Sequence, residues 1–219
     1  MKNTKIQKQT SDMRTAVLTA IAFATLTLSS AFAQGLNANS NSAKFDLVRS
    51  PGLSLFPKVA PHAHGTVKIH SIGPVEIMKV EVSGLPPKTD FDFFVIQVPN
   101  APFGLSWYQG DIQTDSNGDG SREFIGRFSI ETFIVAPGVA PAPADPFHQA
   151  GSIPDATQNP QTNPVQLFHL GLWFDNPADV VKEGGPNTIT AFNGEHTAGI
   201  QVLNTSNFPD ANGPLEKVQ

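Results

Sequence analysis

The chain has 219 residues, a formal net charge of −5 at pH 7 and no cysteine. The lack of cysteine excludes disulfide bonds and thiol chemistry, so burial of apolar side chains must stabilise the fold. With 19 acidic against 14 basic residues, the chain offers no basic stripe that could neutralise phosphate groups. The composition therefore argues against a nucleic-acid partner.

The first 33 residues have the pattern of a secretory signal peptide. Basic side chains come first, an apolar run covers 16–28, and Ala31-Phe32-Ala33 supplies a cleavage motif. Spanning a bilayer takes roughly 20 apolar residues, so this run is too short for a membrane anchor. We expect cleavage after Ala33 and a secreted or periplasmic product with no membrane attachment. Removing residues 1–33 takes away four basic and one acidic side chain, which moves the net charge from −5 to −8.

Most of the remaining chain shows the two-residue alternation of β-strands. Residues 34–43, rich in Asn, Ser and Ala, are expected to form a flexible lead-in to a single domain over 44–207. Apolar alternation predicts strands over 44–48, 65–72, 75–82, 91–98, 105–108 and 111–114. The run 91–98 is apolar on both sides after Asp92, so we expect a central strand with both faces covered.

The segment from Asp115 to Gly120 predicts a turn before a further strand. Its Asp-x-Asn-x-Asp-Gly spacing matches half of an EF-hand loop, but the glutamate expected at the twelfth position is replaced by Gly126. A hairpin turn is favoured, because Asn-Gly and Asp-Gly suit positive φ. In the strand expected over 123–134, Phe124, Phe128 and Ile130 are predicted to face the core.

The second half of the chain mixes strands with one helix. Residues 136–164 hold seven prolines and predict an extended insertion, functional or disordered. A buried strand is expected over 165–174, then a helix capped by Asp175 or Asn176, a hairpin over 188–203 and a polar tail over 208–219. About eight strands, one short helix and no βαβ alternation predict an all-β fold, an antiparallel β-sandwich or Greek-key barrel.

Histidines provide the candidate metal ligands. His62 and His64 are two apart, so in an extended segment both imidazoles project from one face, and His70 follows on the next strand. His196, beside an Asn-Gly turn, is a further candidate. Copper or zinc would suit such nitrogen ligands, and a solvated loop is the alternative. His169, within a buried strand, is expected to be a hydrogen-bonded core residue.

Other constellations are weaker. Trp107, Tyr108 and Trp173 could stack on sugar rings, but aromatic residues in strands are expected in the core. Four acidic residues have no pairwise spacing that indicates acid/base catalysis: Asp92, Asp111, Asp175 and Glu195. No nucleophile elbow, phosphate-binding loop or dinucleotide fingerprint occurs.

Three segments carry a family resemblance. The segments 64–69, 80–89 and 91–95, with Gly84-Leu85-Pro86 between strands, resemble secreted CHRD-like and Cu,Zn superoxide dismutase-like β-sandwiches. The resemblance implies a sandwich fold. In the dismutases the strand after this turn carries a copper-binding His-x-His, whereas the comparable positions here are Phe and Val. The structural disulfide of the dismutases is also missing. The resemblance therefore does not imply dismutase activity. Segments 168–174 and 192–202 resemble uncharacterised exported bacterial proteins.

These patterns favour an exported, non-catalytic β-domain that binds another molecule, such as a protein, or has a structural role. The first alternative is a copper- or zinc-binding or redox protein using the four candidate histidines. The second is a carbohydrate-binding module built on Trp107, Tyr108 or Trp173. These hypotheses differ in whether metal is bound and in whether the aromatic rings are exposed.

Overall fold

The computed structural model describes residues 41–134, 165–190 and 192–219. The expected signal peptide 1–33, residues 34–40 of the lead-in and the proline-rich insertion 136–164 lie outside the described residues. The described residues belong to one compact unit. None of the helices in the described ranges is long and apolar enough to cross a membrane.

The described residues form an antiparallel β-fold, which confirms the predicted fold class. The main sheet has eight strands in the order β5-β4-β9-β10-β1-β2-β3-β6, and β7 pairs with β8 in a second small sheet. The strands are β1 (Ser42–Arg49), β2 (His64–Ser71), β3 (Glu76–Ser83), β4 (Asp90–Ile96), β5 (Ser106–Gln113), β6 (Gly120–Gly126), β7 (Phe133–Ile134), β8 (Val165–Gln166), β9 (His169–Phe174) and β10 (Gln201–Asn204).

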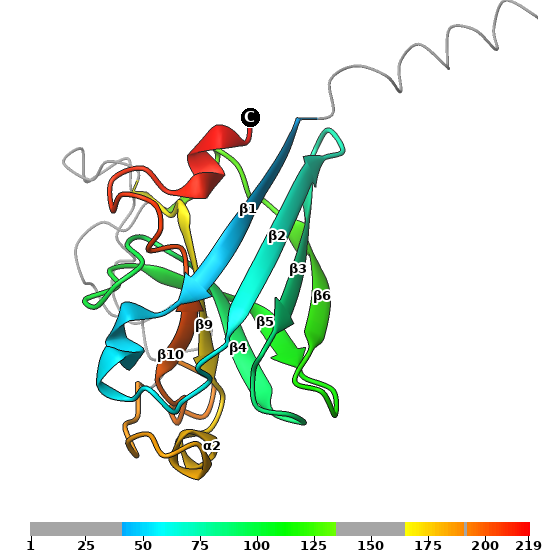
Figure 1. Cartoon of the computed structure of the whole chain (residues 1–219). Coiled ribbons are helices and arrows are strands. Elements are labelled where there is room, and N and C mark those ends of the chain that lie inside the picture. Colours follow the sequence, from blue (N-terminus) through cyan, green and yellow to red (C-terminus); the bar gives the residue numbers. More distant parts are fainter. Residues whose placement is uncertain (1–40, 135–164, 191) are drawn as a thin grey trace, which may run out of the picture. The chain divides into compact units, whose positions relative to one another are not determined.

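The main sheet curls into a nearly closed barrel (Figure 1). Strand β1 joins its two halves, because the first part of β1 pairs with β2 and its end pairs with β10. At the opposite side β5 and β6 approach each other, and the Arg122 side chain on β6 donates a 2.8 Å hydrogen bond to the Asp111 carbonyl on β5. The two outermost strands of the order are therefore neighbours.

Alternating side chains from both halves fill the barrel. Strand β4 contributes Phe91 and Phe93, and the Phe93 ring stacks on Phe124 of β6 with ring centroids 5.2 Å apart. Aromatic burial of this size supplies much of the stability of a domain that lacks disulfide bonds. The other buried core residues include Leu47, Val67, Ile69, Met78, Val80, Leu170, Leu172 and Phe174.

A second apolar cluster covers the outer face of β4 and β9. Phe94, Ile96 and Trp173 are buried there beneath Phe103 and Phe192. Every residue of β4 after Asp90 is buried. The inner side chains face the barrel, and Phe94 and Ile96 on the outer face belong to this cluster. The prediction of a central strand covered on both faces is confirmed.

The Asp115–Gly120 segment is a hairpin turn between β5 and β6, as predicted. The Asp115 carboxylate accepts backbone N–H bonds from Asn117 at 2.7 Å and Asp119 at 3.1 Å. These backbone hydrogen bonds lower the pKa of Asp115 because they favour its ionised form. The carboxylate is thus used to hold the turn, and the EF-hand alternative loses its first ligand.

The helix predicted after residue 175 is α2 (Pro177–Lys182). Asn176 is its N-cap, and its side-chain oxygen accepts a 2.8 Å hydrogen bond from the Ala178 N–H. Pro177 follows, where a missing N–H costs nothing. Gly184, with φ of +82°, ends the helical segment.

Three expectations about strands are wrong. The two strands expected over 105–108 and 111–114 form one strand, β5. No strand forms over 188–190 or 192, so the predicted final hairpin reduces to β10 with a long connection. Strand β6 ends at Gly126, after which the chain turns; Phe124 and Phe128 are buried as predicted, but Ile130 is 43% exposed.

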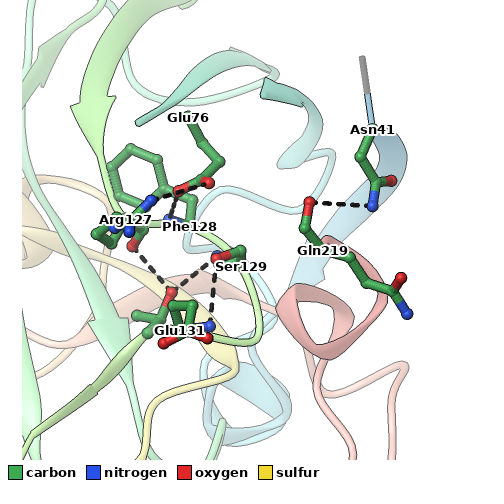
Figure 2. A network of polar contacts seen from close by, with 8 residues as sticks. Asn41, Glu76, Arg127, Phe128, Ser129, Glu131 and Gln219 are labelled. Carbon is green, nitrogen blue, oxygen red and sulfur yellow. Dashed lines mark hydrogen bonds and ion pairs between the residues drawn. The ribbon is translucent and has the colours of Figure 1, made fainter. Parts of the chain in front are cut away.

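Residues 208–219 were expected to form a polar tail, yet they pack on the barrel. A 3₁₀ helix, η2 (Pro214–Lys217), places Leu215 in the core together with Val218. The Val218 carbonyl accepts a hydrogen bond from the Ile130 N–H, and the Gln219 carbonyl accepts one from Asn41 (Figure 2). The end of the chain therefore closes one end of the described unit.

A buried carboxylate fixes the chain where it leaves β6. Glu76 on β3 is 2% exposed; its Oε2 accepts a 2.8 Å hydrogen bond from the Phe128 N–H, and its Oε1 lies 3.7 Å from the Arg127 guanidinium (Figure 2). The Thr132 hydroxyl accepts a hydrogen bond from the Ser129 N–H and donates one to the Arg127 carbonyl. These bonds hold the turn that follows β6. This network holds Phe128 in the core although the strand has ended.

Replacing Glu76 by Ala should lower the free energy of unfolding by about 1–3 kcal/mol, because it leaves the buried Phe128 N–H without an acceptor. Glu76→Gln, which keeps an acceptor oxygen, should cost less. Urea unfolding measures both, with Glu123→Ala on the exposed face of β6 as the control. Equal losses in the free energy of unfolding for the Ala and Gln variants would show that the hydrogen bond to the Phe128 N–H does not stabilise the fold.

Candidate ligand-binding site

An acidic cavity of about 730 Å³ lies on the outer face of the sheet. Its volume falls within the range of small-molecule sites, which is roughly 300–1,000 Å³. Five of its lining residues are carboxylic acids, and none of the lining residues is Lys, Arg or His; the lining comprises Asp90, Asp92, Tyr108, Asp111, Asp175, Phe192, Asn193, Gly194 and Glu195. The cavity is therefore strongly electronegative.

Strand pairing brings the acidic side chains together. Asp92 of β4 is directly opposite Asp111 of β5, so the two side chains are neighbours on one face. Asp90 lies two residues earlier on β4 and shares that face. The Asp175 N–H, just after β9, donates a 3.1 Å hydrogen bond to the Asp90 carbonyl, which continues the β4–β9 ladder by one step.

A β-bulge in β5 adds Tyr108 to the same face. Phe93 pairs with Gly110 and Phe94 pairs with Tyr108, so β5 has one extra residue at this point. Residues three apart normally face opposite sides of a strand, but the bulge turns Tyr108 and Asp111 the same way. The Tyr108 hydroxyl donates a short hydrogen bond to Asp111 Oδ1. Gly110, with φ of +141°, supplies the backbone conformation that the bulge requires.

Asp92 is the buried acid of the site. It is 1% exposed, and its Oδ2 has no hydrogen-bond partner among the described residues. Burial, followed by the charges of Asp175 and Asp111, raises the pKa of Asp92 to about 7. These causes act in one direction, because desolvation and nearby negative charges both disfavour a carboxylate. Asp92 therefore changes its charge near neutral pH.

Aromatic rings form part of the cavity wall. The Phe94 ring lies 5.5 Å from the Tyr108 ring and 5.7 Å from the Phe192 ring, measured between centroids. Burial and the hydrogen bond to Asp111 raise the pKa of Tyr108, so its hydroxyl remains a donor at physiological pH. The wall next to the carboxylates is thus apolar and aromatic.

The loop before β10 covers one side of the cavity. The Asn193 side chain donates hydrogen bonds of 2.9 Å to both the Asp175 carbonyl and Asp175 Oδ1. The Asn193 side-chain oxygen in turn accepts the Thr197 N–H at 2.7 Å, which closes the turn that carries Glu195. Asn193 therefore fixes the loop, and with it Glu195, to the end of β9.

The candidate metal-binding histidines do not come together. His62, His64, His70 and His196 are all exposed, and the described ranges contain no group of three or more His, Asp or Glu side chains able to hold a metal. His64 and His70 are at opposite ends of β2, about 20 Å apart for six residues of strand. Copper or zinc binding at His62 and His64 alone stays a prediction.

His64 and His169 have other partners. His64 Nδ1 lies 2.8 Å from the Ser83 hydroxyl on the paired strand β3. His169 is fully buried, with Nδ1 2.9 Å from the Thr205 hydroxyl and Nε2 3.2 Å from the Asp210 carbonyl. Burial lowers the pKa of His169, which keeps the ring neutral. The prediction of a hydrogen-bonded core histidine is confirmed.

The large aromatic residues divide into two groups. Trp173 is fully buried, as expected, but Trp107 is 59% and Tyr108 47% exposed, so the core prediction is wrong for these two. Trp107 lines a separate groove of about 380 Å³ between the ends of β5 and β6. The groove also contains Ile125, Arg127, Glu131 and Phe133.

The acidic cavity was not predicted from the sequence, because its carboxylates are up to 105 residues apart and are joined only by strand pairing. One signal was present. Asp92 interrupts a strand that is otherwise apolar on both faces, and a carboxylate in such a strand is a candidate for a perturbed pKa.

Neither a scan with protein-family models nor a search of curated proteins matches the chain. The cavity is therefore judged on its own geometry and charge.

Proposed function

We propose that the protein is an exported binding protein for organic cations, and that the acidic cavity is its ligand site. The observation that carries this proposal is Asp92, a buried acid with an unpaired oxygen in a cavity lined by four further carboxylates and no basic side chain. Buried acidic groups are costly unless a partner compensates them, and a cationic ligand would be that partner. Export is supported by the signal-peptide pattern of residues 1–33.

The lining favours an ammonium or guanidinium group over a metal ion. The five carboxylates of the lining include no group of three able to hold a metal ion, as is true of the described residues in general. Tyr108 and Phe192 present aromatic rings beside them, and organic cations are attracted to ring faces by about 0.5–2 kcal/mol. Binding without chemistry agrees with the non-catalytic role that the sequence favours.

The exposed Trp107 favours a second candidate, carbohydrate binding in the groove between β5 and β6. A tryptophan face exposed beside the polar Gln109, Arg127 and Glu131 could stack on a sugar ring and bond its hydroxyl groups. This groove is distinct from the acidic cavity, so the two candidates predict different ligands.

A thermal-shift and calorimetry panel at pH 8 tests the proposal. Butylamine, choline and arginine methyl ester should stabilise the purified protein, whereas 1-butanol and glucose should not. Asp111→Asn should weaken amine binding about tenfold, as expected for losing one charge-assisted contact of about 1.4 kcal/mol. Asp46→Asn, which changes an exposed carboxylate of β1 outside the cavity, should bind as the wild type does.

Stabilisation by neutral oligosaccharides but by no amine would contradict the proposal. If the Trp107→Ala variant were no longer stabilised by oligosaccharides, carbohydrate binding would replace organic-cation binding as the proposed function. Added salt should weaken amine binding, because screening reduces the attraction between the cavity and a cation.

A further inference from the structure

Four of the five carboxylates of the cavity lie at or beside two positions of β4 that share one face of the sheet. On one rung Asp92 of β4 is paired with Asp111 of β5. Two residues earlier on β4, the Asp90 carbonyl accepts a hydrogen bond from the Asp175 N–H. All four side chains line the same cavity. The acidic groups therefore occupy two places along β4, and Asp175 is close enough to Asp92 for its charge to act there as well.

Strand geometry sets the distance between these two places. Residues two apart on a strand are separated by about 7 Å, so Asp90 and Asp92 are about that far apart along β4. Asp111 and Asp175 come from the strands on either side of β4, which separates the two pairs slightly further. A single ammonium group could neutralise one pair only. A four-carbon diamine, extended along β4, has its two nitrogens a comparable distance apart.

The surroundings of the two pairs differ in burial. Asp92 is almost wholly buried and has an unpaired Oδ2, whereas Asp90 is exposed and Glu195 stands nearby on the covering loop. An elongated ligand entering the cavity would meet the Asp90–Asp175 pair at the rim before it reaches Asp92. The cavity volume of about 730 Å³ leaves room for a chain longer than a single charged group.

We infer, on the basis of the proposed function, that the ligand is a linear dication: a diamine or a longer polyamine that places one ammonium group between Asp92 and Asp111 and a second beside Asp90 and Asp175. The ring faces of Tyr108 and Phe192 contact its methylene chain. The cavity thereby selects for the number and spacing of charges, and a monoamine satisfies only half of the site.

Calorimetric titration of the full purified protein with 1,4-diaminobutane, spermidine and butylamine tests this inference. We expect 1,4-diaminobutane to bind at least tenfold more tightly than butylamine. Asp90→Asn should weaken diamine binding about tenfold and change butylamine binding less than twofold, because Asp90 serves only the second ammonium group. The Asp90 side chain has no hydrogen-bond partner in the described structure, so this variant should fold normally.

The outcomes separate the inference from the function on which it rests. Equal affinities for butylamine and 1,4-diaminobutane would overturn the inference and leave organic-cation binding intact. Binding of no amine at all would overturn both. Glu195→Gln gives a second check at the rim and should reduce the preference for the diamine, whereas Asp46→Asn should change neither affinity.

Discussion

Replacing Asp92 by Asn should make the protein more stable than the wild type at pH 8 while leaving the two nearly equal at pH 4. The folded protein raises the pKa of Asp92 from 3.8 to about 7, so between these values the folded state holds a proton that the unfolded state has lost. Stability therefore falls as pH rises through this interval and stays low above it. The difference corresponds to at most about 4 kcal/mol.

Urea unfolding at several pH values between 4 and 8 measures this effect. The wild type should lose stability as pH rises, and Asp92→Asn should remove that part of the slope because the amide does not ionise. Asp46→Asn, at an exposed site, should keep the wild-type slope. An Asp92→Asn variant with an unchanged slope would show that Asp92 is not the group that titrates.

The same substitution should weaken amine binding at pH 8. The buried negative charge of ionised Asp92 destabilises the protein when no ligand is bound. The same charge attracts a cationic ligand. A residue that lowers stability yet improves ligand binding is typical of functional sites.

Replacing Phe93 by Ala should lower the free energy of unfolding by about 3–5 kcal/mol, the usual cost of removing a buried phenylalanine ring. Phe93 is fully buried and stacks on Phe124, so the truncation removes apolar contact between β4 and β6 and leaves a cavity inside the barrel. The loss is a large part of the total stability of a domain of this size.

Thermal and urea unfolding check this prediction. Phe133→Ala is the matched control, because Phe133 is 42% exposed and should cost much less. Phe93→Leu should fold with a smaller loss, which gives a measurable value if the alanine variant does not fold. A loss for Phe93→Ala no greater than that for Phe133→Ala would contradict the assigned core.

Local pattern was sufficient for much of the fold. Alternation located β3 and β4, the Asn-Gly and Asp-Gly pairs located the turn before β6, and Asn176-Pro177 located the start of α2, because each depends on neighbours in sequence. Strand β5 was divided in two, since its bulge interrupts the period of two. Leu215 and Val218 were missed in a polar stretch because a single turn of helix offers too few apolar residues to form a pattern.

The site could not be predicted in the same way. Its acidic residues come from β4, β5, the end of β9 and the loop before β10, and only tertiary pairing places them on one cavity wall. His62 and His64 had recognisable spacing, yet the structure does not add a third ligand to them among the described residues. Spacing along the sequence thus indicated the histidines. The acidic cavity depends instead on contacts between residues that are distant along the chain.

The bulge in β5 determines which aromatic side chain belongs to which surface. If β5 kept Gln109 but ran as a regular strand, the alternation beyond Gly110 would reverse: Trp107 would join Asp111 on the outer face of the sheet, and Tyr108 would turn to the inner face. The bulge thus lets β5 accommodate one extra residue while Tyr108 and Asp111 share one face. Deleting Gln109 would remove the bulge and leave Tyr108 opposite Phe94, still on the face that carries Asp111.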